Sequence, residues 1–164
     1  MNRVGLGFDV HPFGDESPLV LGGLRITDAP RLAGHSDGDA VAHAVCDALL
    51  GPCGLPDLGT LFPASDESHR DADSMAMLAD VVQRIVRGRW CVNNVDIVIA
   101  AETPRLAPHM SDMAANLTAT LASAAEPGGD GVFVSVRPKR GEGLGAIGRA
   151  EGIAVWAVAL LSRS

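Results

Sequence analysis

Three residues in the first part of the chain have the types and the spacing of a metal site. Asp9 and His11 lie two residues apart within residues 4–11, a run of apolar residues and glycines without a helical period, which predicts a strand. Because side chains alternate faces along a strand, Asp9 and His11 point to the same side. With His43 as the natural third ligand, one tetrahedral position stays open, as catalytic zinc requires. The sequence therefore predicts a zinc site on a carboxylate and two imidazoles.

The third ligand belongs to a second polar motif, residues 34–47, which reads GHSDGDAVAHAVCD. The start of this motif supplies N-cap chemistry and the rest consists of good helix formers, so we expect a helix over about residues 37–51. Polar residues that recur every four positions would line one face of that helix: His35, Asp39, His43 and Asp47. Asp39 or Asp47 is then placed to hold the second ring nitrogen of His43. For each of these residues taken singly, a solvated polar face with some capping is the alternative.

Composition restricts the class of protein. The 164 residues suit a single domain, residues 1–164, with a proper core. Although 47% of the residues are hydrophobic, no stretch approaches about 18 uninterrupted apolar residues, so we expect no membrane span. A net charge of −7, no basic stripe and few aromatic residues argue against nucleic acid as a partner. A diphosphate is compatible with this charge, because metal ions, helix N-termini and a few arginines can bind it.

Other sequence features point to a cytoplasmic enzyme. The chain enters a strand almost at once, which leaves no room for a signal peptide. Its three cysteines have no paired metal spacing and are expected to be reduced thiols of a cytoplasm.

The residues Gly5-Leu6-Gly7 lack the third glycine and the following helix of a dinucleotide-binding fingerprint. A single lysine beside a dozen arginines is a bias typical of GC-rich bacterial genomes.

The remaining pattern predicts an α/β (α+β) domain in which helices cover a mixed four- to five-stranded sheet. We expect strands at 3–11, 91–101 and 132–137, a hairpin at 19–26, helices at 74–89 and 108–124, an exposed loop over 57–73 and a helical turn near Glu142. Residues 152–161 are apolar almost throughout, so periodicity cannot decide between strand and helix there.

These motifs resemble the 2-C-methyl-D-erythritol 2,4-cyclodiphosphate synthase family. The matching blocks are GLGFDVHPF, LAGHSDGDAVAHAVCDALLG, DLGTLFP, NVDIVIAAETPRLAPH and LGAIGRAEGIA, which together run from residue 3 to about residue 161. The resemblance implies a final strand, a homotrimer, and cyclisation of 4-diphosphocytidyl-2-C-methyl-D-erythritol 2-phosphate with release of CMP. In that reaction the 2-phosphate of the substrate is itself the nucleophile, so no activated serine or cysteine is needed.

The resemblance also assigns roles to residues. It implies Zn²⁺ on Asp9, His11 and His43, and a second ion, Mg²⁺ or Mn²⁺, on Glu142. It implies that His35 is catalytic and that substrate is contacted by Asp9, His11, His35, Ser36, Asp57, Gly59, Phe62, Asp66, Glu142 and Ala146. The cytidine end would be bound by Ala101, Pro104, Arg105 and Ala107, with Arg105 where the family generally has lysine.

The chain departs from the family pattern over residues 137–142. The family usually reads KATTTE there, whereas this chain reads RPKRGE. Lys139 and Arg140 replace threonine hydroxyls that donate to the diphosphate, and Arg140 takes the position of a catalytic threonine. A cation can take over such a role; solvated surface charges with weaker nucleotide binding are the alternative.

Two further readings remain open from the sequence. The resemblance gives Arg149 the place of an arginine that binds isoprenoid diphosphate at the centre of the family's trimer, and an internal salt bridge is the alternative for it. The altered segment also leaves room for a zinc-dependent phosphohydrolase, or for a non-catalytic trimer that binds isoprenoid diphosphates.

Overall fold

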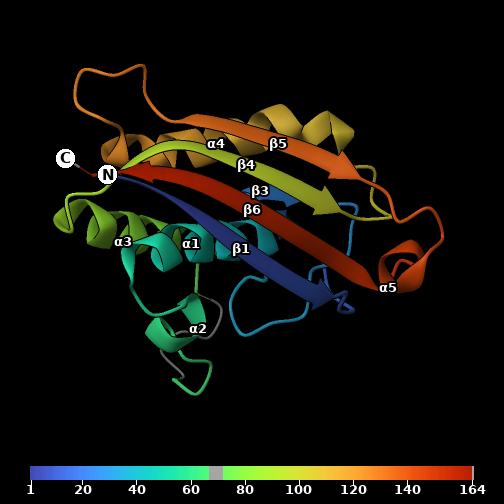
Figure 1. Cartoon of the computed structure of the whole chain (residues 1–164). Helices are drawn as coiled ribbons and strands as arrows, with labels where there is room; N and C mark the ends of the chain where they lie inside the picture. Colours follow the sequence, from blue (N-terminus) through green and yellow to red (C-terminus); the bar gives the residue numbers. More distant parts are fainter. Residues whose placement is uncertain (67–71, 164) are drawn as a thin grey trace.

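The computed structural model describes residues 1–66 and 72–163. Its centre is a mixed four-stranded sheet with the order β1-β6-β4-β5 (Figure 1). The strands are β1 (Asn2–Pro12), β4 (Cys91–Ala100), β5 (Phe133–Lys139) and β6 (Gly152–Ser162). β6 is antiparallel to both β1 and β4, whereas β4 and β5 are parallel. The expected α+β architecture is confirmed, and the undecided last segment is a strand.

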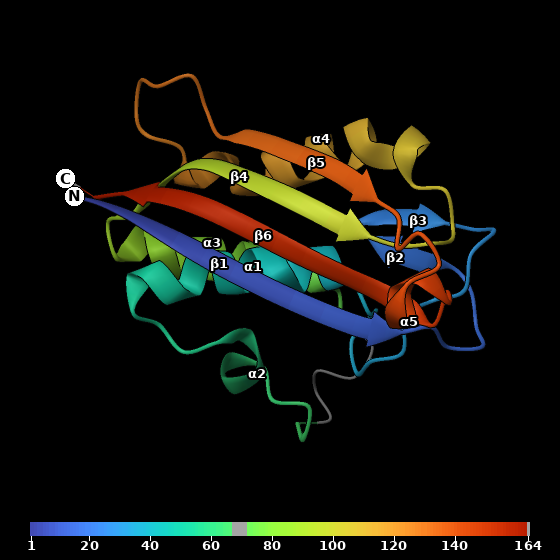
Figure 2. The same ribbon diagram turned by 45° about the vertical axis from the view of Figure 1, so that its right-hand side comes forward.

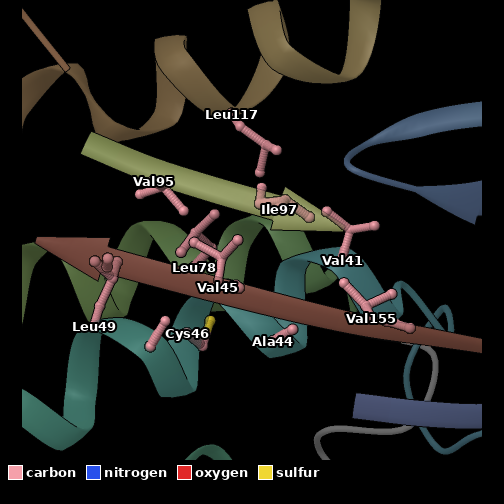
Figure 3. Packing of buried hydrophobic residues seen from close by; sticks show 14 of the residues in the cluster. Val41, Ala44, Val45, Cys46, Leu49, Leu78, Val95, Ile97, Leu117 and Val155 are labelled. Atoms are coloured by element: carbon pink, nitrogen blue, oxygen red, sulfur yellow. The ribbon is translucent and has the colours of Figure 1, made fainter. Parts of the chain in front are cut away.

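Three helices cover one face of this sheet (Figure 2). They are α1 (Ala40–Cys53), α3 (Ser74–Arg87) and α4 (Met110–Leu121), and α4 is flanked by 3₁₀ turns at Ala107–His109 and Ala122–Ala124. The hydrophobic core lies between these helices and the sheet. Figure 3 shows side chains such as Val41 and Val45 of α1 gathered with Ile97 of β4 and Leu117 of α4. The helices predicted from apolar spacing are therefore confirmed.

The opposite face of the sheet is open. Among the described residues no helix lies over it, and the outward side chains of β1 and β6 include six apolar ones: Val4, Leu6, Phe8, Val10, Trp156 and Val158. These side chains are between 40% and 69% exposed. This explains why periodicity could not assign β6, because a strand whose two faces are both apolar has no polar alternation.

Glycines let β1 lie directly on α1. A Cβ atom at Gly5 would meet the Ala48 carbonyl oxygen at 1.9 Å, and one at Gly7 would meet the Ala44 carbonyl oxygen at 1.8 Å. Only glycine permits so close an approach of strand and helix. Gly5 and Gly7, which resemble part of a dinucleotide-binding fingerprint, thus serve the packing of β1 on α1. This packing brings the end of β1 beside α1.

Smaller elements complete the chain. A hairpin of β2 (Leu19–Leu21) and β3 (Leu24–Ile26) turns through Gly22 and Gly23, both with positive φ, as the sequence predicts. Two single-turn helices are α2 (Leu58–Leu61) and α5 (Gly145–Gly148). α2 interrupts the loop that was expected over 57–73, because Asp57 caps it; residues 67–71 of that loop lie outside the described residues. No helix within residues 1–66 and 72–163 is long and apolar enough to cross a membrane.

The helix expected from residue 37 begins later, at Ala40. The Asp39 carboxylate accepts from the backbone N–H groups of Val41 and Ala42, which makes Asp39 the N-cap. His35 therefore lies in the loop before the helix, and the prediction that it lines a helix face with His43 is wrong. Asp47 remains on α1, one turn after His43.

Candidate functional site

Asp9, His11 and His43 meet where β1 passes over α1. Ligand atoms of all three residues lie within 4.8 Å of one another. Asp9 Oδ2 is 2.9 Å from His11 Nδ1 and 3.2 Å from His43 Nδ1. The three side chains are between 16% and 20% exposed, so the cluster is mostly shielded from water while staying open on one side. The spacing Asp-x-His and the distant helical histidine thus come together as the sequence predicts.

The donor set of this cluster fits a divalent metal. One carboxylate and two imidazoles are ligands that zinc accepts in three-ligand catalytic sites. The His11 Nδ1 atom is buried and, despite its 2.9 Å separation from Asp9, has no hydrogen-bond partner of acceptable geometry among the described residues. A buried polar atom without a partner needs an explanation, and a bound cation provides one.

The electrostatics of the metal-free cluster follow from its geometry. Burial alone would raise the pKa of Asp9, but the close contacts with His11 and His43 and the charge of these imidazoles outweigh burial and lower it. Burial alone would lower the pKa of His43, but the hydrogen bond and the charge of Asp9 outweigh burial and raise it. In the absence of metal, the carboxylate therefore favours a proton on the His43 imidazole, and a cation would take the place of that proton.

The second ring nitrogen of His43 is held by serines. His43 Nε2 lies 3.1 Å from Ser36 Oγ and 3.0 Å from Ser74 Oγ. The expectation that Asp39 or Asp47 holds this nitrogen is therefore wrong. Asp39 is fully buried and, within residues 1–66 and 72–163, accepts from backbone N–H groups alone, at the start of α1 and at the turn of Gly22 and Gly23.

Asp47 is also engaged elsewhere. Its carboxylate accepts the backbone N–H of Leu58 at 2.8 Å and so anchors the start of α2. Ser74, which replaces these aspartates beside His43, was missed because it is the first residue of α3 and reads in the sequence only as part of a helix start. Its approach to His43 depends on how α3 packs against α1, which no local pattern reveals.

A cavity of about 360 Å³ opens beside the three metal-ligating candidates. Its lining brings together the metal cluster and several residues that the family resemblance assigned to substrate: Asp9, His11, His43, His35, Ser36, Gly59 and Phe62. Asp47 and Ala64 also line it. Asp57 and Asp66 do not, since Asp57 accepts from the Thr60 N–H as the cap of α2 and Asp66 is exposed beyond it.

A second cavity, of about 560 Å³, lies at the carboxyl ends of the parallel strands β4 and β5. It is lined by the loop that follows β4 and by the end of β5: Ala101, Glu102, Thr103, Pro104, Arg105, Leu106, Ala107, Pro138, Lys139 and Arg140. All four residues predicted to bind cytidine thus share one cavity with the two cations of the altered segment. The two cavities have no lining residue in common.

Glu102 ties the two walls of this second cavity together, and it was not predicted. Its carboxylate pairs with the Arg140 guanidinium and accepts the backbone N–H of Gly141 at 3.1 Å. The hydrogen bond from Arg140 lowers the pKa of Glu102, and the same bond raises the pKa of Arg140. The sequence does hold a signal for this ion pair, because an acidic residue follows one strand and a basic run ends another. The signal can be used only once the two strands are known to be parallel neighbours.

Glu142, Ala146 and Arg149 line neither cavity. Glu142 is exposed, has a positive φ of 53° and follows β5, while Ala146 lies on α5. Arg149 Nε donates to Glu151 at 2.6 Å, in agreement with the salt bridge that was the simpler reading of this residue.

Comparisons with known proteins agree with the fold and with the motifs. The YgbB family matches residues 2–162. A 2-C-methyl-D-erythritol 2,4-cyclodiphosphate synthase of Rubrobacter xylanophilus is 51% identical over 99% of this chain and 96% of its own length. One of Bordetella petrii is 44% identical over the same shares of the two chains.

Solved structures give the same result. A structure titled as IspF from Plasmodium falciparum in complex with CDP has a TM-score of 0.81 and 30% identity, and the match covers 99% of this chain and 97% of that one. The bifunctional IspDF of Campylobacter jejuni has a TM-score of 0.90 and 35% identity over the whole of this chain, which spans 43% of that longer protein. On sequence, fold and site motifs alike, the chain belongs to the YgbB family of 2-C-methyl-D-erythritol 2,4-cyclodiphosphate synthases.

Proposed function

We propose that this chain is a 2-C-methyl-D-erythritol 2,4-cyclodiphosphate synthase, a phosphorus–oxygen lyase of non-mevalonate isoprenoid biosynthesis. The observation that carries the proposal is the Asp9, His11 and His43 cluster on a cavity, in a chain 51% identical to a relative of that name. The substrate is 4-diphosphocytidyl-2-C-methyl-D-erythritol 2-phosphate. An oxygen of its 2-phosphate forms a bond to the β-phosphorus while the bond to the bridging oxygen of the α-phosphate breaks, so that CMP leaves and the cyclic 2,4-diphosphate remains.

The nucleophile and the leaving group both belong to the substrate. The protein therefore has to position these two groups and to stabilise the negative charge on the phosphate oxygens. His35 and Ser36 line the cavity next to the cluster and are proposed to hold the methylerythritol phosphate, with His35 beside the reacting phosphate. Gly59 and Phe62, which line the same cavity, are proposed to contact the sugar hydroxyls. The family resemblance extends this proposal to Asp57 and Asp66, which the lining of the cavity does not include. Walls of this kind also exclude water, which would otherwise hydrolyse the diphosphate.

Zinc is the metal proposed for Asp9, His11 and His43, and Mg²⁺ or Mn²⁺ is proposed for Glu142. When bound, these ions would act as Lewis acids that neutralise negative charge on the phosphate oxygens. Support comes from the donor set and from the unpartnered nitrogen of His11. Protein purified without added metal should contain about one zinc per chain, and His43→Ala should lose it; full retention by that variant would exclude this ligand set.

The cavity lined by Ala101, Pro104, Arg105 and Ala107 is proposed to bind the cytidine diphosphate end. Support comes from solved relatives whose titles name CDP as the ligand. Lys139 borders the same cavity, is exposed, and has no ion-pair partner among the described residues, which leaves its ammonium available for phosphate. Arg140 is already paired with Glu102, so its proposed catalytic contact with the diphosphate requires it to share or exchange that partner.

A homotrimer is proposed for the assembled protein, with Arg149 toward its centre and Ala146 in contact with the substrate. Six outward apolar side chains on β1 and β6 form a continuous exposed face, which is unusual for a monomer. The metal cavity and the nucleotide cavity are separate on one chain, so a complete site would combine the first cavity of one subunit with the second cavity of its neighbour. We also propose a cytoplasmic location, with Cys46, Cys53 and Cys91 as reduced thiols.

The proposal is tested by incubating the protein with the diphosphocytidyl substrate, zinc and magnesium, and by measuring CMP by chromatography. CMP should appear with the wild type and fail to appear with His43→Ala. Absence of CMP with the wild type would favour the alternative of a non-catalytic trimer that binds isoprenoid diphosphates. The phosphohydrolase alternative also releases CMP, so the second product decides between the two enzymes.

A further inference from the structure

Ser74 joins the metal cluster to the carboxylate of Asp37, which is partly buried. It is the first residue of α3 and is fully buried, and its Oγ atom lies 3.0 Å from His43 Nε2. The same hydroxyl makes a short hydrogen bond to Asp37 Oδ1, and the Ser74 backbone N–H donates to Asp37 Oδ2 at 3.2 Å. Asp37, Ser74, His43 and Asp9 therefore form one continuous chain of contacts that ends at the metal cluster.

The direction of the hydrogen bonds along this chain is fixed by chemistry. A carboxylate can only accept, so the single hydroxyl proton of Ser74 points at Asp37. Ser74 Oγ can then offer only a lone pair to His43, which requires a proton on His43 Nε2. A neutral imidazole carries one proton, so with Nε2 protonated the Nδ1 atom, 3.2 Å from Asp9 Oδ2, offers its lone pair to a cation that takes the place of the proton shared with Asp9.

Ser36 does not reverse this direction. Its Oγ atom accepts the backbone N–H of Gly38 at 3.3 Å and lies 3.2 Å from Ser74 Oγ and 3.1 Å from His43 Nε2. Because Nε2 already donates toward the two hydroxyl oxygens, Ser36 acts as a second acceptor for the same proton. Its own proton is then available to the cavity that Ser36 lines.

From this geometry we infer that Ser74 and Asp37 are positioning residues that hold His43 in its Nε2-protonated tautomer, with the Nδ1 lone pair aimed at the metal. This inference rests on the metal site proposed above. Partners of this kind orient a ligating imidazole and raise its basicity. Asp37 is itself fixed, because it also accepts the backbone N–H of Asp39 at 3.2 Å and its own N–H donates to the Ala72 carbonyl at 3.2 Å.

A purely structural role is the competing account, since the same bonds dock the start of α3 onto the loop before α1. The neighbouring Asp73 separates the two accounts. Its side chain is exposed, and its carboxylate caps α3 by accepting from the backbone N–H groups of Met75 and Ala76 rather than from Ser74, His43 or Asp37. Asp73→Ala should therefore lower the melting temperature through the helix start while leaving zinc affinity unchanged.

The experiment measures zinc affinity by competition with a chromophoric chelator for the wild type, Ser74→Ala, Asp37→Asn and Asp73→Ala. Ser74→Ala and Asp37→Asn should each bind zinc roughly ten- to a hundredfold more weakly, as removal of such partners generally does. Affinity equal to that of Asp73→Ala in both variants would overturn the inference and leave only the docking role.

A second measurement needs neither zinc nor catalysis. Nitrogen NMR of the metal-free protein at mildly alkaline pH reports which nitrogen of His43 carries the proton. In the metal-free wild type Asp9 competes for a proton on Nδ1, so the comparison is made in Asp9→Ala, which should show Nε2–H. When Asp37→Asn is added, the amide can donate to Ser74, which frees the Ser74 hydroxyl to donate to His43, so the signal should shift toward Nδ1–H. An Nδ1–H tautomer in Asp9→Ala would refute the inference even if the chain is an active synthase, and an Nε2–H tautomer would uphold it even if zinc is the wrong metal.

Discussion

Lys139 and Arg140 line the same cavity but differ in whether their charged groups form an ion pair. Arg140 is paired with Glu102, whereas Lys139 has no ion-pair partner among the described residues. Loss of a charge-assisted hydrogen bond to phosphate costs about 1.5–3 kcal/mol, which is a roughly ten- to hundredfold drop in affinity. We expect Lys139→Ala to lower CDP affinity, measured by calorimetry, by that factor, and Arg140→Ala to lower it less.

The control for these variants is Arg87→Ala, at the exposed end of α3 and outside both cavities. If Lys139→Ala and Arg140→Ala bind CDP as tightly as Arg87→Ala, the altered segment is a solvated turn and has no part in nucleotide binding.

Glu102 can be tested in the same assay. Its pKa is lowered by the hydrogen bond from Arg140, so at neutral pH it is charged and neutralises that guanidinium. Glu102→Gln should free the charge of Arg140 and strengthen CDP binding at low salt, with the gain disappearing at high salt because of screening. Weaker binding in Glu102→Gln at every salt concentration would mean that Glu102 serves only to hold Gly141 in place.

The thiol of Cys53 gives a pH prediction that is independent of the site. Burial raises the pKa of Cys53 from 9.0 to about 11. Because the pKa is higher in the folded than in the unfolded chain, the buried thiol contributes fully to the stability of the fold below about pH 9. This contribution is lost as the pH rises toward 11. Alkylation of folded protein at pH 8, followed by peptide mass spectrometry, should therefore label Cys53 about a hundredfold more slowly than the unfolded chain, since thiolate is the reactive form. Equal rates would show that Cys53 is not shielded.

Residue types and local spacing sufficed to predict Asp9, His11 and His43, because a strand and a helix place such residues by simple periodicity. The same local logic failed for Asp39, which reads as a ligand-supporting carboxylate but sits at a helix cap and satisfies four backbone N–H groups. Ser74 and Glu102 could not be found, because their contacts depend on which elements pack side by side.

Among the elements, β1 and α1 together form the metal cluster, and their contact depends on Gly7. Gly7→Ala would place a methyl carbon 1.8 Å from the Ala44 carbonyl oxygen, so strand and helix must separate. We expect a loss of about 1–3 kcal/mol in the free energy of unfolding, measured by urea denaturation. Zinc affinity should fall as well, because Asp9 and His11 move away from His43.

Gly51→Ala is the matched control on α1. A Cβ atom there meets nothing within 4 Å, and alanine in place of a helical glycine stabilises by roughly 0.5–1 kcal/mol. If Gly7→Ala were as stable as wild type and bound zinc normally, the close approach of β1 and α1 would not determine the site.

Helices and strands with one apolar face were predictable within a few residues, as α3 and β4 illustrate. α2 was not, because a four-residue helix held by the Asp57 cap and by Asp47 has no period of its own. The pairing order β1-β6-β4-β5 was likewise beyond local patterns, since it joins the two ends of the chain.

For the whole molecule, the open apolar face of the sheet predicts association. Light scattering at micromolar concentration should give three times the mass of one chain. Leu6→Lys, at a side chain 67% exposed on that face, should shift the protein toward monomer, whereas Val86→Lys, at a side chain 37% exposed on α3, should not. A wild type that stays monomeric would contradict the trimer and the proposal that neighbours share a site.

The identity of the second product tests the proposed activity most directly. Phosphorus NMR of the substrate incubated with protein, zinc and magnesium should show CMP appearing together with the two coupled resonances of a cyclic diphosphate, and neither should appear with His43→Ala. CMP together with a non-cyclic bisphosphate would mean that water is the nucleophile and that the altered 137–142 segment has made the protein a phosphohydrolase. An unchanged substrate spectrum would contradict catalysis altogether.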